Sequence, residues 1–172
     1  MNDHKGFFAM MARMKYIERW ALMRNSVSEN ICEHSLEVAM LAHGLGIIGR
    51  KRFGKDLSPE RLAMLGMYHD CTEIITGDMP TPVKYANDEL KEAYKAIEDS
   101  AAHRLLEMLP EDLRAEYESY FLPEQITPEE YRYVKAADKL SALIKCIEEE
   151  KTGNQEFRSA KQATYESLQQ MN

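Results

Sequence analysis

Apolar residues recur at intervals of three and four along most of this chain, whereas the alternating pattern of a β-strand is nearly absent. Such spacing places side chains on one face of an α-helix. One connecting segment, residues 18–31, breaks the helical period. The sequence therefore predicts an all-α fold, a single compact helical bundle of about six or seven helices, over residues 7–16, 33–49, 59–75, 87–109, 110–121, 128–152 and 155–170.

Helix start and stop signals mark the ends of several of these segments. Ser58 and Thr127 each stand directly before a proline, which supplies an N-cap hydroxyl followed by proline in the first turn. Gly77 and Gly153 are glycine stops for the third and sixth expected helices. Two prolines shortly after Gly77 prevent a regular helix from continuing there.

The apolar residues that recur at helical spacing also predict which side chains form the core. One run of charged residues predicts a solvated helix face. Glu148, Glu149 and Glu150 are interpreted as a solvated helix face. The residues expected to be buried are Leu36, Met40, Leu41, Leu45, Ile48, Leu62, Leu65, Met67, Leu90, Tyr94, Ile97, Ala101, Leu105, Val134, Ala137, Leu140, Ile144 and Ile147.

Length and charge narrow the classes of function. A chain of 172 residues has the size of one domain, which we expect to span residues 1–172. Its net charge of −7 argues against binding a nucleic acid polymer, which usually needs a basic face. Three cysteines without a CxxC pair favour a reducing, cytoplasmic location. We find no signal peptide and expect no membrane-spanning segment.

Five residues could carry chemistry. His69 and Asp70 form an HD dipeptide, and Glu73 follows within one helical turn, where the three can share a face. His34 lies one turn into the second expected helix, and Asp138 lies on an otherwise apolar stripe. Simpler interpretations exist, because a histidine near a helix C-terminus interacts with the helix dipole, and a buried carboxylate can sit in a salt bridge.

Two imidazoles and two carboxylates nevertheless form a mixed nitrogen and oxygen donor set. That set suits one divalent ion of the first transition row, such as Mn, Co, Fe or Zn. A bound ion of this kind lowers the pKa of its water and polarises a phosphoryl oxygen.

The order of these residues, H…HD…D, resembles the HD-domain metal-dependent phosphohydrolases. More specifically, the chain from about Phe7 to Phe157 resembles the bacterial 5′-deoxynucleotidase family. The segments that carry this resemblance are Glu18-Arg19-Trp20, Glu33-His34-Ser35, Tyr68-His69-Asp70-Cys71-Thr72-Glu73 and Thr76-Gly77-Asp78-Met79-Pro80-Thr81-Pro82-Val83-Lys84.

The resemblance implies an HD-domain helical fold and a reaction. The divalent ion would be held by His34, His69, Asp70 and Asp138. Deoxyribonucleoside 5′-monophosphates would be hydrolysed to deoxyribonucleosides and phosphate, with Glu73 in acid–base or water-orienting work. The resemblance also implies a homodimer that acts on a small nucleotide.

The resemblance further implies how the nucleotide is bound. Arg19 would hold the phosphate, since a planar guanidinium suits two phosphate oxygens, and Trp20 would crowd the sugar 2′ position and reject ribonucleotides. Asp78 would lie near the reacting phosphate as a catalytic residue. The other residues expected to contact the nucleotide are His34, Met79, Pro80, Thr81 and Asp138.

Other interpretations of the same residues stay open. Arg19 can be a surface cation, Trp20 a core indole, Asp78 a turn residue, and Lys84 is interpreted as solvated. The HD residues also fit an enzyme acting on another nucleotide, such as a triphosphate or a cyclic nucleotide. A third alternative is a non-catalytic sensor of metal or nucleotide.

Overall fold

The protein is described by a computed structural model that covers residues 6–171. These residues form helices and no strand, with one isolated β-bridge between Glu18 and Asn30, so the all-α prediction is confirmed. The α-helices are α1 (Phe7–Met11), α2 (Ile31–Phe53), α3 (Pro59–Tyr68), α4 (Glu73–Thr76), α5 (Thr81–Lys84), α6 (Asp88–Leu106), α7 (Glu111–Phe121), α8 (Pro128–Lys151) and α9 (Arg158–Gln169). Three short 3₁₀ helices are η1 (Ala12–Tyr16), η2 (Pro123–Gln125) and η3 (Gln155–Phe157).

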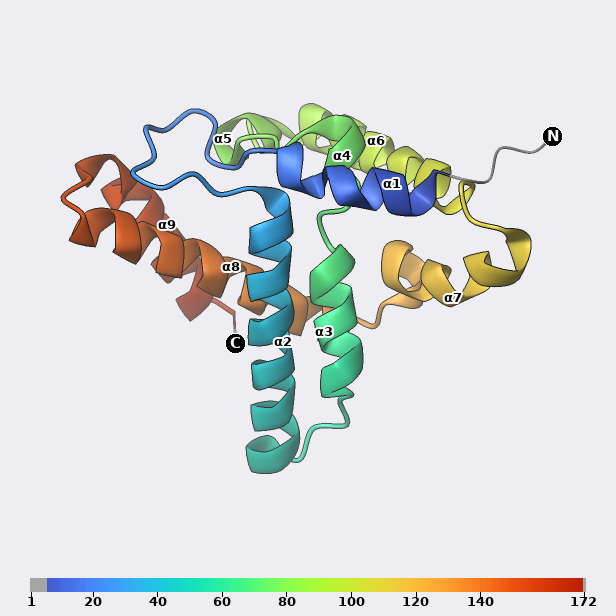
Figure 1. Cartoon of the computed structure of the whole chain (residues 1–172). Helices are drawn as coiled ribbons and strands as arrows, with labels where there is room; N and C mark the ends of the chain where they lie inside the picture. The colour runs from blue at the N-terminus through green and yellow to red at the C-terminus, as the bar shows by residue number, and fades with distance from the viewer. Residues whose placement is uncertain (1–5, 172) are drawn as a thin grey trace.

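The helices pack around α2, α3 and α8 (Figure 1). α2 and α3 lie side by side and run antiparallel, joined by the short connection after Phe53, and both contact α8. The N-terminal end of α2 and the C-terminal end of α3 therefore meet at the same end of the pair. The connection over residues 17–30 lies above that end in Figure 1.

Two glycines allow α2 and α3 to approach closely. A Cβ atom at Gly66 would lie 3.0 Å from the backbone of Ala39, and one at Gly46 would lie 2.8 Å from the Leu62 side chain. Both contacts are tighter than ordinary van der Waals packing. The face of α2 that meets α3 is accordingly built from small residues.

This close approach corrects the expected core of α2. Leu36 and Met40 are 55% and 60% exposed, and Ile48 is also exposed. The buried face instead carries His34, Ser35, Val38, Ala39, Ala42, Gly46 and Gly49. The larger side chains turn outward because the contact with α3 has room only for small ones.

Further expectations about burial and helix limits are also corrected. Met67, Ile97 and Ile144 are exposed, whereas Glu149 is buried and not on a solvated face. α3 ends at Tyr68 rather than near Ile75, and residues 69–72 form a turn before α4.

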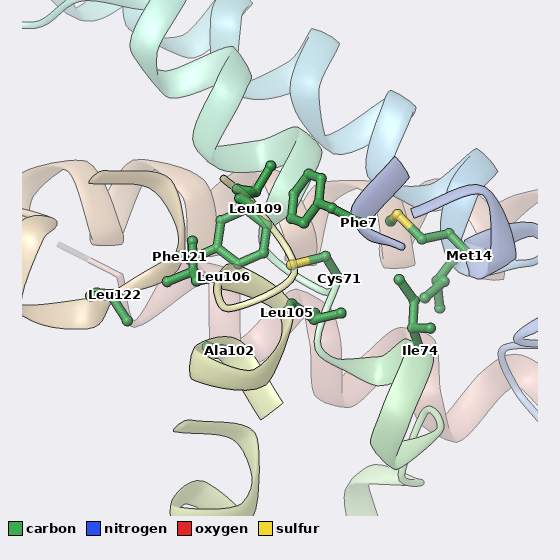
Figure 2. Close-up of a cluster of buried hydrophobic side chains, with 11 residues drawn as sticks. Phe7, Met14, Cys71, Ile74, Ala102, Leu105, Leu106, Leu109, Phe121 and Leu122 are labelled. Atoms are coloured by element: carbon green, nitrogen blue, oxygen red, sulfur yellow. The ribbon is translucent and has the colours of Figure 1, made fainter. Parts of the chain in front are cut away.

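A cluster of buried side chains fixes this turn in place (Figure 2). Cys71 and Ile74 point from the turn and α4 into a core formed with α1, α6 and α7. That core consists of Phe7, Met14, Ile31, Cys71, Ile74, Ala102, Leu105, Leu106, Leu109, Phe121 and Leu122. Burial of Cys71 anchors the neighbouring His69 and Asp70.

Within residues 6–171, α2 is the helix that is long and apolar enough, by length and composition, to cross a membrane. The helix packs against both α3 and α8 and carries His34, so its buried apolar residues belong to the core of this fold.

Candidate metal centre

Three elements bring the candidate metal ligands together. His34 lies in the first turns of α2, which begins with a capping box between Asn30 and Glu33. His69 and Asp70 lie in the turn after α3, and Asp138 lies in the middle of α8. The helical continuation through His69 that the sequence predicts is wrong, and the turn directs the HD pair toward α2 and α8.

Three of the four side chains form a tight group, and Asp138 faces two of them. Donor atoms of His34, His69 and Asp70 all lie within 4.8 Å of one another. Nε2 of His34 is 3.5 Å from Oδ2 of Asp70 and 3.2 Å from Oδ1 of Asp138. Nε2 of His69 is 3.0 Å and 3.9 Å from the same two oxygens. Each imidazole nitrogen thus faces both carboxylates.

The second nitrogen of each imidazole is already engaged. Nδ1 of His69 lies 2.7 Å from the carbonyl oxygen of Gly66, and Nδ1 of His34 lies 3.1 Å from Oγ of Ser141. Among the residues that the structure describes, the buried Nε2 atoms of both histidines have no hydrogen-bond partner. Buried polar nitrogens without partners are costly, and two of them facing two carboxylates fit a divalent metal ion.

Ser141 and Glu37 form a hydrogen-bond chain that orients the His34 imidazole. The sequence analysis missed both residues. The hydroxyl of Ser141 donates to Oε2 of Glu37 at 2.9 Å, which leaves its oxygen free to accept from His34. A signal was present, because Glu37 follows His34 by three residues on α2, and Ser141 follows Asp138 by three residues on α8.

The carboxylates of the centre are held in their charged form. Burial opposes ionisation of Asp138, but its close contact with His34 and the charge of Lys135 keep its pKa well below the ordinary value. Nζ of Lys135 lies 3.2 Å from Oδ2 of Asp138. Burial likewise opposes ionisation of Asp70, and the charge of His69 lowers its pKa overall. Both residues are therefore ready to bind a cation.

Arg19 reaches the same centre from the connection over residues 17–30. Its Nη1 lies 3.5 Å from Oδ2 of Asp70, and its Nε lies 3.4 Å from Oε2 of Glu29. The guanidinium is largely buried, and Asp78 and Asp138 also stabilise its charge. Arg19 is therefore not a surface cation, and its contacts are long enough to leave N–H groups available to an anion.

Glu73 is buried beside the centre, and its carboxyl is more stable protonated than ionised. Burial raises its pKa to about 10, and the charges of Asp70 and Asp78 act in the same direction. Within residues 6–171, its Oε2 atom has no hydrogen-bond partner. A carboxyl in this environment is typical of acid–base sites.

Asp78 follows Gly77, whose φ of 75° lies in the region that glycine adopts readily. Burial raises the pKa of Asp78, while the charge of Arg19 opposes that rise. Met79 and Pro80 are half-buried and Thr81 is exposed at the start of α5, so their contacts with a nucleotide stay predictions. Lys84 is not simply solvated, since its Nζ pairs with Oε1 of Glu98 at 2.8 Å.

Trp20 adopts a strained backbone conformation next to the centre. It has a φ of 59°, the one positive value for a non-glycine residue among residues 6–171. Its indole Nε1 donates to Oε2 of Glu29 at 2.6 Å, and its ring packs 5.3 Å from that of Phe157. Trp20 is half-buried, so part of the indole stays accessible.

Comparison with known proteins identifies the family to which this arrangement belongs. The sequence profile described as "5′-deoxynucleotidase YfbR-like" matches residues 6–172. The chain belongs to this family. A 5′-deoxynucleotidase of Vibrio cholerae is 52% identical over 155 residues, which cover 90% of this chain and 80% of that protein. A 5′-deoxynucleotidase of Erwinia tasmaniensis is 49% identical over 97% of this chain and 84% of its own length.

Solved structures place this YfbR-like chain among the HD-domain folds. An HD-domain phosphohydrolase from Listeria innocua superposes with a TM-score of 0.80 at 24% identity, covering 96% of this chain and 81% of that one. The cyanophage S-2L HD phosphohydrolase DatZ, bound to dA and one catalytic Zn²⁺ ion, has a TM-score of 0.57 at 27% identity. It covers 80% of this chain and 69% of its own. The resemblance noted from the H…HD…D order is thereby confirmed.

Proposed function

We propose that this protein is a metal-dependent 5′-deoxynucleotidase that hydrolyses deoxyribonucleoside 5′-monophosphates to deoxyribonucleosides and phosphate. The observation that carries the proposal is the pair of buried Nε2 atoms, on His34 and His69, that face Asp70 and Asp138 beside Arg19. The family supplies the substrate class, since its curated members are named 5′-deoxynucleotidases.

His34, His69, Asp70 and Asp138 would hold one divalent ion. Two neutral imidazoles and two carboxylates suit Zn, Mn, Co or Fe, and the relative bound to dA contains one catalytic Zn²⁺ ion. When bound, such an ion neutralises phosphate charge and lowers the pKa of neighbouring water.

Arg19 and Glu73 then act on the phosphate and on the attacking water. The guanidinium of Arg19 binds two phosphate oxygens and aligns the phosphorus for in-line attack. Positive charge in the centre would oppose the effects that raise the pKa of Glu73 and so favour its carboxylate form, which can accept a proton. Glu73 orients the water and takes its proton as the bond to phosphorus forms.

Asp78 is assigned to the leaving group. Burial raises its pKa against the opposing charge of Arg19, so its carboxyl holds a proton more readily than that of an ordinary aspartate. As the bond between phosphorus and the 5′ oxygen breaks, Asp78 donates this proton to the 5′ oxygen. The products are a neutral deoxyribonucleoside and inorganic phosphate.

Trp20 supplies the selection for deoxyribose. A bulky indole against C2′ leaves room for hydrogen but clashes with a hydroxyl group, which penalises ribonucleotides. Met79, Pro80 and Thr81 are assigned to contacts with the rest of the nucleotide.

A cytoplasmic homodimer is the assembly that we propose. The exposed side of α2 presents Leu36, Met40 and Ile47 at helical spacing, an apolar stripe that a second copy could cover. Light scattering of the purified protein measures its mass in solution, and Met40→Asp tests the stripe. A monomeric wild-type protein would exclude this assembly.

The function is tested by phosphate release from deoxy- and ribonucleoside 5′-monophosphates, with a 3′-monophosphate as a control substrate. Protein stripped of metal is assayed alone and with Mn, Co, Zn or Mg. We expect release only from the 5′-deoxy substrates, dependent on metal and lost in Asp70→Ala. Metal-dependent release from another phosphate would keep the centre and change the substrate. Tight ion binding without turnover would indicate a sensor.

A further inference from the structure

The connection over residues 17–30, here called the 17–30 loop, is closed at its base by backbone pairing. The amide of Arg19 donates to the carbonyl of Glu29 at 2.8 Å, and the amide of Ile31 donates to the carbonyl of Ile17 at 2.9 Å. Glu18 and Asn30 form the β-bridge between these bonds. This pairing places Glu29 directly opposite Arg19, where the loop leaves and re-enters the core.

The carboxylate of Glu29 contacts three residues of the site. Its Oε2 accepts from the indole Nε1 of Trp20 at 2.6 Å and lies 3.4 Å from Nε of Arg19. Its Oε1 lies 3.6 Å from Nδ1 of His34, an electrostatic contact that is too long for a hydrogen bond. Glu29 is only 8% exposed, so these contacts are made largely out of water, where charge interacts more strongly.

Trp20 has an unfavourable backbone conformation, which its contact with the Glu29 carboxylate helps to stabilise. A non-glycine residue with φ of 59° is less stable than one in an ordinary conformation, and it persists only when the surroundings fix it. The Trp20 carbonyl accepts from the amide of Met23 at 2.9 Å, and the indole is held by Glu29. The short bond between indole and carboxylate therefore selects one orientation of the ring.

We infer that Glu29 is a positioning residue for deoxyribose selectivity, because one buried carboxylate fixes the Trp20 indole and the Arg19 guanidinium relative to His34. The inference rests on the proposed roles of Trp20 at the sugar and Arg19 at the phosphate. Glu29 touches neither the substrate nor the ion, and it acts by setting the distance between the residues that do.

A matched control is a second buried glutamate that binds the same loop from α8. Glu149 of α8 is 2% exposed and binds the loop tip, since its Oε2 accepts from the amide of Ser26 at 2.9 Å. Its carboxylate also accepts from the amide of Val27 at 3.3 Å and from Nδ2 of Asn154 at 2.8 Å. Glu149 also pairs with Nζ of Lys145 at 2.5 Å, and it contacts none of Trp20, Arg19 and His34 directly. Glu149→Gln therefore reports the effect of loosening the loop tip.

The first test uses fluorescence, because Trp20 is the only tryptophan in the sequence. Emission and acrylamide quenching are measured for the wild type, Glu29→Gln, Glu29→Ala and Glu149→Gln. We expect a shifted emission and stronger quenching in Glu29→Ala, a smaller change in Glu29→Gln, whose amide oxygen can still accept from the indole, and no change in Glu149→Gln. Unchanged emission in Glu29→Ala, or an equal change in the control, would overturn the inference.

The second test compares kcat/KM for dAMP and AMP in the same variants and in Trp20→Ala. A charge-assisted hydrogen bond of this kind predicts that Glu29→Ala lowers the ratio of deoxy to ribo activity by about tenfold. Glu29→Gln should keep most of the ratio but raise KM for both substrates, since the charge opposite Arg19 is lost. A ratio that falls in Trp20→Ala but not in Glu29→Ala would refute the positioning role.

The two tests separate this inference from the proposed function. If the wild type hydrolyses neither nucleotide, or if Trp20→Ala leaves the ratio unchanged, the proposed substrate or the role of Trp20 is wrong. The fluorescence of the Glu29 variants then decides by itself whether Glu29 fixes the indole.

Discussion

Replacing Glu73 by glutamine should make the stability of the metal-free protein less dependent on pH. Glu73 is buried, one of its oxygens has no hydrogen-bond partner among residues 6–171, and its pKa is raised to about 10. In the unfolded chain an ordinary glutamate has a pKa of about 4.3. Between these two values the folded protein binds one proton more than the unfolded chain at this position.

The sign and the size of the effect follow from that extra proton. Because the folded state binds more protons, the free energy of unfolding falls as the pH rises, by up to about 1.36 kcal/mol per pH unit. Between pH 5 and pH 7 this amounts to at most about 2.7 kcal/mol. Glutamine does not titrate, so the Glu73→Gln protein lacks this slope. The buried amide can also shift the stability by a constant amount of about 1–3 kcal/mol, which leaves the slope unaffected.

Urea denaturation in the presence of a chelator, at pH values from 5 to 8, measures both curves. We expect the difference in unfolding free energy between Glu73→Gln and the wild type to increase steadily with pH. Glu149→Gln is the control. Several hydrogen bonds keep the pKa of Glu149 well below its ordinary value, despite the opposing effect of burial. Its contribution to stability is complete above the unfolded pKa and is lost only as the pH falls through the lower folded value. Parallel curves for Glu73→Gln and the wild type between pH 5 and pH 8 would refute the reasoning.

Three other predictions concern the metal centre and its frame. Ser141→Ala removes the acceptor for Nδ1 of His34, so metal affinity in a competition titration should fall by about 10- to 100-fold; an unchanged affinity would show that the hydroxyl is not needed. Adding Zn²⁺ or Mn²⁺ at about 100 times its dissociation constant from the wild type should raise the unfolding free energy of the wild type by about 2.7 kcal/mol. A gain of equal size in Asp138→Asn at the same metal concentration would contradict the ligand set. Gly66→Ala places a methyl group 3.0 Å from the backbone of Ala39 and should lower the unfolding free energy by about 1–3 kcal/mol, as measured by urea denaturation.

Much of the fold could be predicted because local signals mark its helices. The capping box at Thr127 and the N-cap at Ser58 are both present, and α7 ends at Phe121 as expected. The outward-facing side of α2 could not be predicted in this way. Periodicity shows that Leu36 and Met40 share a face with one another, but not that small residues occupy the opposite, buried face.

Some residues of the site could be predicted from the sequence, whereas others depend on how the chain folds. The order of His34, His69, Asp70 and Asp138 matches residues that lie together in the structure, the first three with donor atoms within 4.8 Å of one another and Asp138 3.2 Å from Nε2 of His34. Glu29 could not be found from the sequence, because its contacts with Trp20 and His34 depend on how the 17–30 loop closes. Glu149 was assigned to solvent because three consecutive glutamates resemble an exposed face, and only the loop above α8 shows what covers it.

The absence of a side chain at Gly66 has a consequence for the choice of ion. This residue lets α2 approach α3 at Ala39, and its carbonyl oxygen also accepts from the imidazole of His69. The separation between the imidazoles of His34 and His69 is therefore set by the packing of two helices. Divalent ions differ slightly in radius, so discrimination among them depends on residues that never touch the metal. Bulk added at this helix crossing would therefore change the distance between the two imidazoles of this protein.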